Sequence, residues 1–332
     1  MKLGKVLVTA KSVSGCEAAV QLMRQAGCDV VIETTPLPWN EDWMIDHTRD
    51  VAGLIFAMEP VSSRLLDAAT ALKVIARPGV GHDSVDIAAA TRHGVPVTIA
   101  AGANDQSVAD FTMGLLLMST RGLMDGALSV QRHGWERTTG TEAWRKTLAI
   151  VGLGRIGKGV AQRARGFDMR VLAVSTRRDE AFAAAHGIEF VELDQALREA
   201  DFLSLHAPLT AETENLIDAH ALATMKRGAY LINTSRGGLI DEPALAAAVR
   251  SGHLAGAAVD VLRTQGADSP SPLIGVPGII VTPHMATFSR ESMERVAMAA
   301  ARSVIAALEG ERPSVLVNPE VYGPQPTEPP CP

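Results

Sequence analysis

Arg236 and His284 are the residues of this 332-residue chain that could combine anion binding with proton transfer. Arg236 follows the apolar run Tyr230–Asn233, in YLINTSRGGLIDE, and His284 follows the run Ile279–Val281, in IIVTPHMAT. A guanidinium can hold a carboxylate and polarise a carbonyl, and an imidazole can give or take a proton near neutral pH. A lone arginine is usually a surface residue and a lone histidine a structural one. The pair therefore indicates catalysis only if other motifs of an active site accompany it.

A glycine motif supplies that context. The apolar run Leu148–Val151 leads into Gly152, Gly154 and Gly157, in LAIVGLGRIGKGVAQRA, and a helical pattern follows. The first glycine permits a tight turn, the second a close approach of backbone to a pyrophosphate, and the third close packing of helix on strand. The sequence therefore predicts a dinucleotide site. With Arg236 and His284 at the ends of other strands, it predicts hydride transfer between a nicotinamide and a 2-keto acid.

The end of the next strand decides which nucleotide is favoured. A site for NAD places an acidic side chain there, on the ribose 2′-hydroxyl. This chain has Ser175 instead, followed by Thr176, Arg177 and Arg178. A hydroxyl with guanidinium groups suits a 2′-phosphate, which predicts NADP as the preferred cofactor, with NAD possible. The alternative is that the arginines are solvated loop charges and that the site accepts both nucleotides.

Short β-branched runs alternate with alanine-rich helical stretches, which predicts parallel strands joined by crossover helices. A first series of strands is expected at 6–9, 30–33, 53–57 and 73–76, with helices at 17–25, 62–69 and 86–93. A second series of six strands is expected at 148–151, 170–174, 202–205, 230–233, 255–259 and 279–281, the size of a dinucleotide-binding sheet. Between the series, the apolar stretch Ser107–Thr120 predicts a buried helix, and a long helix is expected at about Arg290–Leu308.

Over residues 50–318, the chain resembles the D-isomer-specific 2-hydroxyacid dehydrogenase family, in its 3-phosphoglycerate dehydrogenase-like branch. The resemblance rests on ordered motifs: VIARPGVGHDSVD (74–86), GANDQSVAD (102–110), WERTTGTE (135–142), VGLGRIGKG (151–159), SLHAPLTAET (204–213), INTSRGGLIDE (232–242), GAAVDV (256–261) and VTPH (281–284). It implies two open, doubly wound parallel-sheet domains and a homodimer. A Rossmann NAD(P) domain (101–287) is inserted into a flavodoxin-like substrate domain (1–100 and 288–320), and 321–332 is expected to be a disordered tail.

The resemblance also implies roles for individual residues. Arg236 resembles the substrate-binding arginine and His284 the general acid/base. Substrate contacts are implied for Arg77, Val80, Gly81 and Asn104, although Arg77 could equally form a salt bridge beneath its loop. Asp260 matches the residue that binds the nicotinamide carboxamide. Other cofactor contacts are implied at Ser107, Gly152, Gly154, Arg155, Ile156, Gly157, Ser175, Thr176, Arg177, His206, Pro208, Thr213 and Thr234.

Gln265 is the main departure from the family pattern, which usually has at this position a glutamate that pairs with the histidine. A neutral glutamine can orient His284 but cannot favour the imidazolium electrostatically. Formate dehydrogenases, distant members of the family, resemble this arrangement, so hydride abstraction from formate is one alternative. Asp268 or Glu291 could instead replace the missing carboxylate. A nucleotide-sensing binding protein that resembles the C-terminal-binding-protein corepressors is a further alternative, although the chain offers little partner-binding sequence beyond its short tail.

Composition limits the remaining classes. The net charge is −6, from 31 basic and 37 acidic residues without charge runs, so neither a nucleic acid nor a membrane surface is expected as partner. The N-terminal MKLGKVLVTA is too short for a signal sequence and reads as a buried strand. Three cysteines, Cys16, Cys28 and Cys331, form neither a disulfide pattern nor a metal motif, so no metal is expected. These features favour the cytoplasm.

Overall fold

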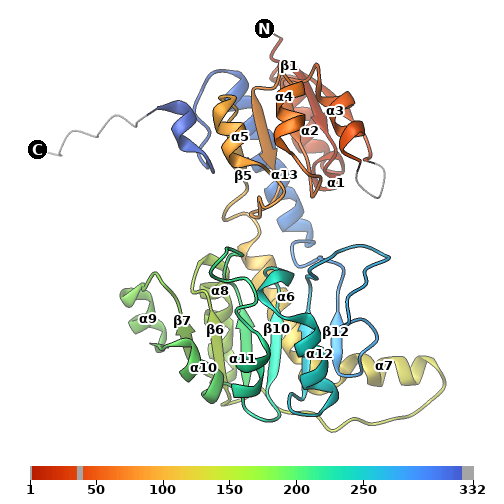
Figure 1. Cartoon of the computed structure of the whole chain (residues 1–332), viewed down its shortest axis with the longest axis vertical. Coiled ribbons are helices and arrows are strands. Elements are labelled where there is room, and N and C mark those ends of the chain that lie inside the picture. Colours follow the sequence, from red (N-terminus) through yellow and green to blue (C-terminus); the bar gives the residue numbers. More distant parts are fainter. Residues whose placement is uncertain (1, 36–39, 324–332) are drawn as a thin grey trace, which may run out of the picture. The chain divides into compact units, whose positions relative to one another are not determined.

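A computed structural model describes residues 2–35 and 40–323, which fall into two compact units (Figure 1). Unit 1 combines Met1–Asn104 with Phe288–Pro332, and unit 2 is the continuous segment Asp105–Thr287. Both ends of the chain therefore build one unit, and the segment between them builds the other. Each unit is a parallel sheet with helices on both faces.

The sheet of unit 1 has five parallel strands in the order β2-β1-β3-β4-β5, the flavodoxin-like order. Its strands are β1 (Gly4–Val8), β2 (Cys28–Ile32), β3 (Gly53–Ile55), β4 (Val74–Arg77) and β5 (Val97–Ile99). Its helices are α1 (Lys11–Ser14), α2 (Glu17–Gln25), α3 (Glu41–Thr48), α4 (Ser63–Ala68), α5 (Ile87–Arg92), α13 (Arg290–Leu308) and the 3-10 turn η3 (Pro319–Tyr322).

Successive strand residues point to opposite faces of this sheet, and both faces are apolar. One core lies under α3, α4 and α5, and it includes Leu7 and Ile75. The other lies under α2 and α13, and it includes Val6, Val8 and Val304. The C-terminal segment completes this unit, because the buried amide of Asn318 accepts from Val97 N at 2.7 Å and donates to the carbonyl of Val95 at 3.0 Å.

The sheet of unit 2 has seven parallel strands in the order β12-β11-β10-β9-β6-β7-β8, the dinucleotide-binding order with an added edge strand. The strands are β6 (Thr147–Val151), β7 (Arg170–Val174), β8 (Ile188–Phe190), β9 (Phe202–Leu205), β10 (Tyr230–Asn233), β11 (Gly256–Val259) and β12 (Ile279–Val281). The six predicted strands are all present, and the edge strand β8 was not predicted. The predicted fold class, two doubly wound parallel-sheet domains, is confirmed.

Two apolar layers cover this sheet, one on each face. The helices are α6 (Asp105–Arg121), α7 (Leu123–Gln131), α8 (Arg155–Ala164), η1 (Arg165–Phe167), α9 (Glu180–His186), α10 (Leu193–Glu199), α11 (Ala219–Thr224), η2 (Gly237–Leu239) and α12 (Glu242–Arg250). Helices α10, α11 and α12 pack on one face, and α6, α8 and α9 on the other. The predicted helix at Ser107–Thr120 is α6, and most of its residues are buried or half-buried, as its sequence predicted.

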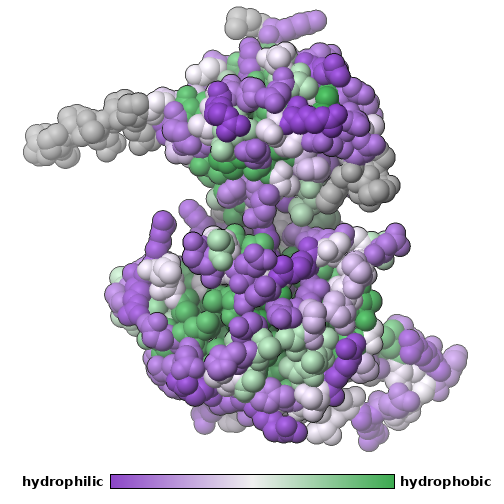
Figure 2. Space-filling view, viewed as in Figure 1, coloured by the Kyte–Doolittle hydropathy of each residue, from purple (hydrophilic) through white to green (hydrophobic). Residues whose placement is uncertain are grey.

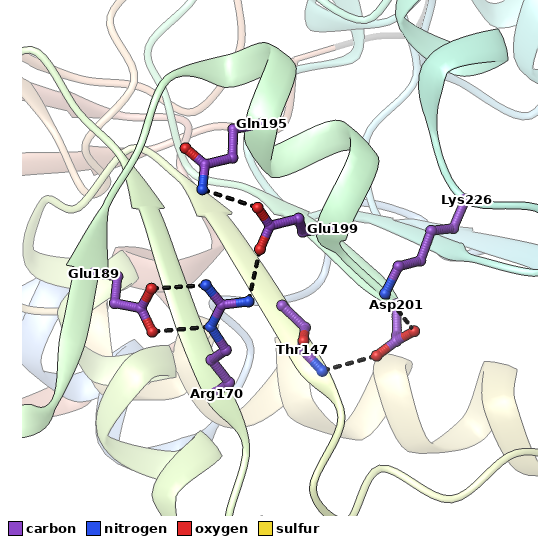
Figure 3. A network of polar contacts seen from close by, with 7 residues as sticks. All are labelled: Thr147, Arg170, Glu189, Gln195, Glu199, Asp201 and Lys226. Atoms are coloured by element: carbon purple, nitrogen blue, oxygen red, sulfur yellow. Dashed lines mark hydrogen bonds and ion pairs between the residues drawn. The ribbon is translucent and has the colours of Figure 1, made fainter.

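A polar network fastens the strand starts of unit 2 at the amino edge of the sheet (Figure 3). The guanidinium of Arg170 donates to both oxygens of Glu189, at 2.8 and 2.7 Å, and to Glu199 at 2.6 Å. Asp201 accepts from the backbone N–H of Thr147 at 2.9 Å and pairs with Lys226 at 3.2 Å. Because this network lies at the amino edge, it does not occupy the loops at the opposite, carboxyl edge of the sheet.

The surface viewed in Figure 2 is hydrophilic over large areas, with separate hydrophobic areas between them. Among the described helices, none is both long and apolar enough to span a bilayer. The described residues also contain no group of three or more His, Cys, Asp or Glu side chains placed to hold a metal ion. The predicted tail begins at residue 321; Val321 and Tyr322 belong to the turn η3, and residues 324–332 lie outside the described part.

Candidate active site

The carboxyl edge of the unit 2 sheet gathers most of the predicted site residues. Because all seven strands are parallel, the loops that follow them emerge at the same edge. The glycine motif follows β6, Ser175 follows β7, His206 follows β9, Arg236 follows β10, Asp260 and Gln265 follow β11, and His284 follows β12. Six loops thus place side chains for nucleotide binding, anion binding and proton transfer along one edge.

The glycine loop has the backbone form that a dinucleotide phosphate requires. Gly152 has a φ of +98°, and a Cβ there would lie 2.6 Å from the carbonyl carbon of His206. A Cβ at Gly157 would collide with the carbonyl oxygen of Gly152, whereas the space beside Gly154 is open. Helix α8 begins directly after Gly154 with no side chain capping its N–H groups. An open, uncapped helix start beside a glycine turn fits a pyrophosphate.

Arg155 and Ile156 form the first turn of α8, the former exposed and the latter half-buried. This is where a nucleotide held by the glycine loop would meet the helix.

The loop after β7 is polar and open. Ser175 is half-buried, and its hydroxyl donates to the carbonyl of Arg177 at 2.8 Å, while Thr176 and Arg177 are exposed. Arg178 pairs with Glu192 at 3.3 Å and lies over the ring of Phe190. The side chain of Arg177 has no hydrogen-bond or ion-pair partner within residues 2–35 and 40–323. The guanidinium of Arg177 is therefore available to bind a ligand near Ser175, the position at which an acidic residue would favour NAD.

The loop after β9 closes against the glycine turn. His206 donates its backbone N–H to the carbonyl of Val151 at 2.7 Å, and its Nε2 lies 2.8 Å from the hydroxyl of Ser204. Burial lowers the pKa of His206 to about 4, so the ring is neutral near pH 7. Thr213 fixes the loop by donating to the carbonyl of Pro208 at 2.7 Å. A neutral, fixed loop suits the uncharged part of a nucleotide.

Arg236 stands on a loop that its neighbours hold in place. The buried amide of Asn233 donates to the carbonyl of Arg236 at 2.8 Å and accepts from the N–H of Ser235 at 2.9 Å. The guanidinium is half-buried, and its Nη1 donates to the carbonyl of Ser235 at 2.7 Å. Thr234 faces α6, where its hydroxyl lies 2.9 Å from that of Thr112. The guanidinium is therefore presented from a rigid turn.

His284 and Gln265 are brought together from different loops. Oε1 of Gln265 lies 2.8 Å from Nδ1 of His284, and the histidine is half-buried with a φ of +52°. The side chains of Asp268 and Glu291, the other acids considered for this role, make no hydrogen bond or ion pair within the described part of the chain. The group that holds the imidazole at Nδ1 is thus the neutral glutamine.

Asp260 holds the His284 loop in its unusual backbone form. Its carboxylate, 1% exposed, accepts from the Thr282 hydroxyl at 2.6 Å and from the N–H groups of Met285 and Ala286 at 2.9 Å each. The carbonyl of Asp260 also accepts from His284 N at 2.9 Å. These contacts make Asp260 an anchor of the loop, a function that sequence reasoning did not assign; its contact with a nicotinamide stays a prediction.

Ser107 belongs to the same assembly. Its hydroxyl, on the first turn of α6, donates to the carbonyl of Ala286 at 2.8 Å. The residue was expected beside the cofactor, and the structure places it against the loop that carries His284.

Glu242 joins the loop of Arg236 to the loop of Gln265, and sequence reasoning missed it. The buried carboxylate accepts from Arg263 N at 2.6 Å and from the Ser271 hydroxyl at 2.7 Å. A Cβ at Gly237 would collide with the backbone of Leu262, so the two loops are in close contact there. In the sequence, an acidic residue at this position indicates only a favourable start for helix α12, so the contacts of Glu242 could not be predicted from it.

The candidate residues of unit 1 also follow strands at a carboxyl edge. Arg77 ends β4, is half-buried, and places Nη2 at 2.9 Å from the sulfur of Met58. Val80 and Gly81 are exposed and half-buried respectively, in the loop that follows, and Asn104 is buried at the end of the unit.

Glu59, after β3, is a buried carboxylate of unit 1 that sequence reasoning missed. It accepts from the N–H groups of Ala57 and Met58, at 2.7 and 2.8 Å, and from the Thr35 hydroxyl at 2.7 Å. Burial raises its pKa, but the hydrogen bonds outweigh that effect and the net change is a lowering. Glu59 is therefore an ionised group that shapes this loop.

Comparisons with known proteins find similar sequences and similar folds. Residues 113–286 match the family model described as D-isomer specific 2-hydroxyacid dehydrogenase, NAD binding domain. The chain is 37% identical over 321 residues to a glyoxylate reductase from Thermofilum pendens, covering 94% of each protein. It is 43% identical over 260 residues to a D-3-phosphoglycerate dehydrogenase from Mycobacterium tuberculosis, covering 78% of this chain but 49% of that protein. A solved structure from Thermus thermophilus aligns with a TM-score of 0.87 and 36% identity, covering 94% of this chain and 99% of that one.

Proposed function

The chain belongs to the D-isomer-specific 2-hydroxyacid dehydrogenase family, and from that premise we propose that it reduces a small 2-keto acid to the D-2-hydroxy acid with NADPH as the preferred hydride donor. Its relatives are dehydrogenases and reductases, and the chain is an NAD(P)-dependent enzyme. The observation that carries the proposal is the placement of the glycine loop, Arg236 and His284 at one edge of one sheet.

Each group has a part in the proposed reaction. A bound nicotinamide would supply the hydride. Arg236 binds the substrate carboxylate and polarises the carbonyl to be reduced. His284 donates the proton that the carbonyl oxygen needs, and Gln265, which accepts from Nδ1, leaves Nε2 as the nitrogen that exchanges this proton. Unit 2 then acts as the cofactor domain.

The preference for NADPH rests on the loop after β7. This loop has a hydroxyl at Ser175 and an uncommitted guanidinium at Arg177 where an NAD site would have a carboxylate. One charge-assisted hydrogen bond of roughly 1.5–3 kcal/mol corresponds to a preference of about 10- to 100-fold in kcat/KM. Equal or better kcat/KM with NADH would contradict the proposal.

Glyoxylate and other short 2-keto acids are the proposed substrates. The Thermofilum pendens relative, which the chain matches along nearly its full length, is named a glyoxylate reductase. The deciding experiment is a spectrophotometric assay with NADPH and a panel of keto acids: glyoxylate, pyruvate, hydroxypyruvate and its 3-phosphate. Oxidation of NADPH by at least one short keto acid is expected, and no turnover on the whole panel would overturn the proposal.

Hydride abstraction from formate is a second candidate, favoured by the neutral Gln265 beside His284. Reduction of NADP⁺ or NAD⁺ by formate, without turnover of the keto acids, would support it over the first.

We also propose that the enzyme is a cytoplasmic homodimer. Helix α7 and the chain after it extend from the rest of unit 2 (Figure 1) and expose five large apolar side chains: Leu123, Met124, Val130, Trp135 and Trp144. Light scattering of the purified protein should give twice the mass of one chain, and a double variant Val130→Glu/Trp135→Glu should reduce it to the mass of one. A monomeric parent protein would contradict this part of the proposal.

A further inference from the structure

Lys158 and Asp179 form an ion pair that joins two segments of the nucleotide edge in unit 2. Nζ of Lys158 donates to Oδ2 of Asp179, and the ammonium also lies 4.8 Å from the ring centroid of Phe182. The other carboxylate oxygen of Asp179 accepts from Phe182 N at 3.0 Å and so caps α9. Asp179 is therefore fixed in position by capping α9, and Lys158 pairs with it there.

The two partners come from the segments between which a nucleotide ribose is held in this fold. Lys158 stands in the first turn of α8, directly after the glycine motif, and its N–H donates to the carbonyl of Gly154 at 2.9 Å. Asp179 ends the loop that begins at Ser175, the position that selects between a 2′-hydroxyl and a 2′-phosphate. A charge on either partner therefore acts on the phosphate that distinguishes NADP from NAD.

Asp179 is a repulsive group for that phosphate unless it is neutralised. The hydrogen bond from Lys158, followed by that from Phe182 N, lowers the pKa of Asp179, so the carboxylate is ionised at pH 7. Arg178 is committed to Glu192, and Arg177 provides a positive charge in the loop without a partner in the described residues. The net charge near the ribose thus depends on whether Lys158 cancels Asp179.

We propose that Lys158, by neutralising Asp179, is a specificity-determining residue that sets how strongly the site prefers a 2′-phosphorylated nucleotide. The inference rests on the proposed NADPH-dependent function and deepens it. A bare carboxylate at Asp179 disfavours the phosphate, a bare ammonium at Lys158 favours it, and the intact pair leaves the choice to Ser175 and Arg177. Both nucleotides carry a 5′-phosphate, so any effect of these charges on that group cancels in the ratio of the two affinities, and the ratio reports the 2′-phosphate alone.

The test is a double-mutant cycle on the two charged residues, in which nucleotide affinity is measured and no turnover is required. Lys158→Met keeps the apolar stem over Phe182, and Asp179→Asn keeps an oxygen that can cap α9. Calorimetry with 2′,5′-ADP and with 5′-AMP measures the affinity for the two nucleotide types. Lys158→Met should weaken 2′,5′-ADP about three- to tenfold and Asp179→Asn should tighten it by a similar factor, as expected for one unit charge a few ångströms away in solvent. The double variant should return to within about twofold of the parent.

Lys226→Met is the matched control, since Lys226 pairs with Asp201 at the opposite edge of the same sheet (Figure 3). It removes the same charge and should leave both affinities unchanged. If Lys158→Met and Asp179→Asn leave the ratio of the two affinities at the parent value, or shift both nucleotides equally, the inference is wrong. A parent protein that binds 5′-AMP better than 2′,5′-ADP would instead contradict the proposed NADPH preference, because the shifts in the ratio are measured independently of its starting value.

Discussion

Oε1 of Gln265 lies 2.8 Å from Nδ1 of His284, so the imidazole of this dehydrogenase is held by a neutral amide. The amide oxygen accepts the hydrogen bond from Nδ1 and fixes the ring, but it adds no charge that favours the imidazolium. The relationship separates two functions that a carboxylate would perform together: orientation of the ring and electrostatic support of its protonated form.

Gln265→Glu should restore that support. Keto-acid reduction needs the imidazolium, so its rate falls as the pH rises and the ring loses its proton. A carboxylate beside Nδ1 favours the protonated ring and should move this alkaline fall to higher pH, by about one unit. The pH profile of kcat/KM for reduction is the measurement. Gln265→Ala, which loses orientation alone, should lower the rate without an upward shift, and an unmoved profile in Gln265→Glu would mean that another group donates the proton.

His284→Ala should abolish keto-acid reduction. The variant removes the proton donor, while the glycine loop and the β7 loop remain intact. NADPH binding, followed by fluorescence titration, should therefore stay within about twofold of the parent, since contacts far apart contribute independently. Keto-acid reduction by His284→Ala at the parent rate would show that His284 is not the proton donor.

Arg236→Lys should fold and bind NADPH but lose at least about 100-fold in kcat/KM for the best keto acid, roughly 2.7 kcal/mol of transition-state stabilisation. Lysine keeps the charge but not the planar fork that grips a carboxylate with two hydrogen bonds. Steady-state kinetics of Arg236→Lys and of Arg227→Lys, an exposed control, measure the difference. Near-normal turnover of Arg236→Lys would exclude this residue as the substrate anchor.

Ser175→Asp should reverse the cofactor preference. A carboxylate there repels a 2′-phosphate and accepts from a free 2′-hydroxyl, so kcat/KM should become higher with NADH than with NADPH. Ser175→Ala, which only loses the 2.8 Å hydrogen bond to the carbonyl of Arg177, should not create a preference for NADH. If Ser175→Asp still prefers NADPH, the ribose is recognised elsewhere.

His206 should make the fold sensitive to acid. Its pKa is lowered from 6.5 to about 4 by burial, so between these values the unfolded chain binds a proton that the folded chain does not. Stability from this group is therefore present above pH 6.5 and declines as the pH falls, by at most about 2 kcal/mol on going from pH 6.5 to pH 5. Thermal unfolding at pH 7 and pH 5 should show a smaller loss for His206→Gln than for the parent. An equal loss in both proteins would place the acid sensitivity in other groups.

Strong local signals made most of the fold predictable. Helices α2 and α13 begin and end at their predicted residues, because each has a clear apolar stripe between polar ends. Strands β5 and β8 were missed, because each has only three residues and a polar middle residue, Thr98 or Glu189, interrupts the apolar run. Helix α7 was missed because its apolar side chains are exposed, so no buried stripe marks it.

The tertiary contacts of the site were less predictable than its residue types. The sequence placed Arg236, His284 and Gln265 in loops, and only the structure shows how the buried carboxylates of Asp260 and Glu242 anchor those loops. Lys158 and Asp179 are separated by 21 positions, and nothing in either segment marks them as partners. Such contacts depend on how loops from different strands meet, which periodicity and motif spacing do not encode.

The construction of unit 1 from both chain ends has a consequence for protein synthesis. Strand β1 and helix α13 share one apolar core, and Asn318 completes the edge beside Val97. At ribosomal speeds, on the order of ten to forty seconds separate the emergence of the first part of this unit from that of the second. Unit 2, being continuous, can finish its sheet during that interval. During that interval one apolar face of the early strands is covered by α2 but not by α13, so the nascent chain exposes part of this core to chaperones until α13 is synthesised.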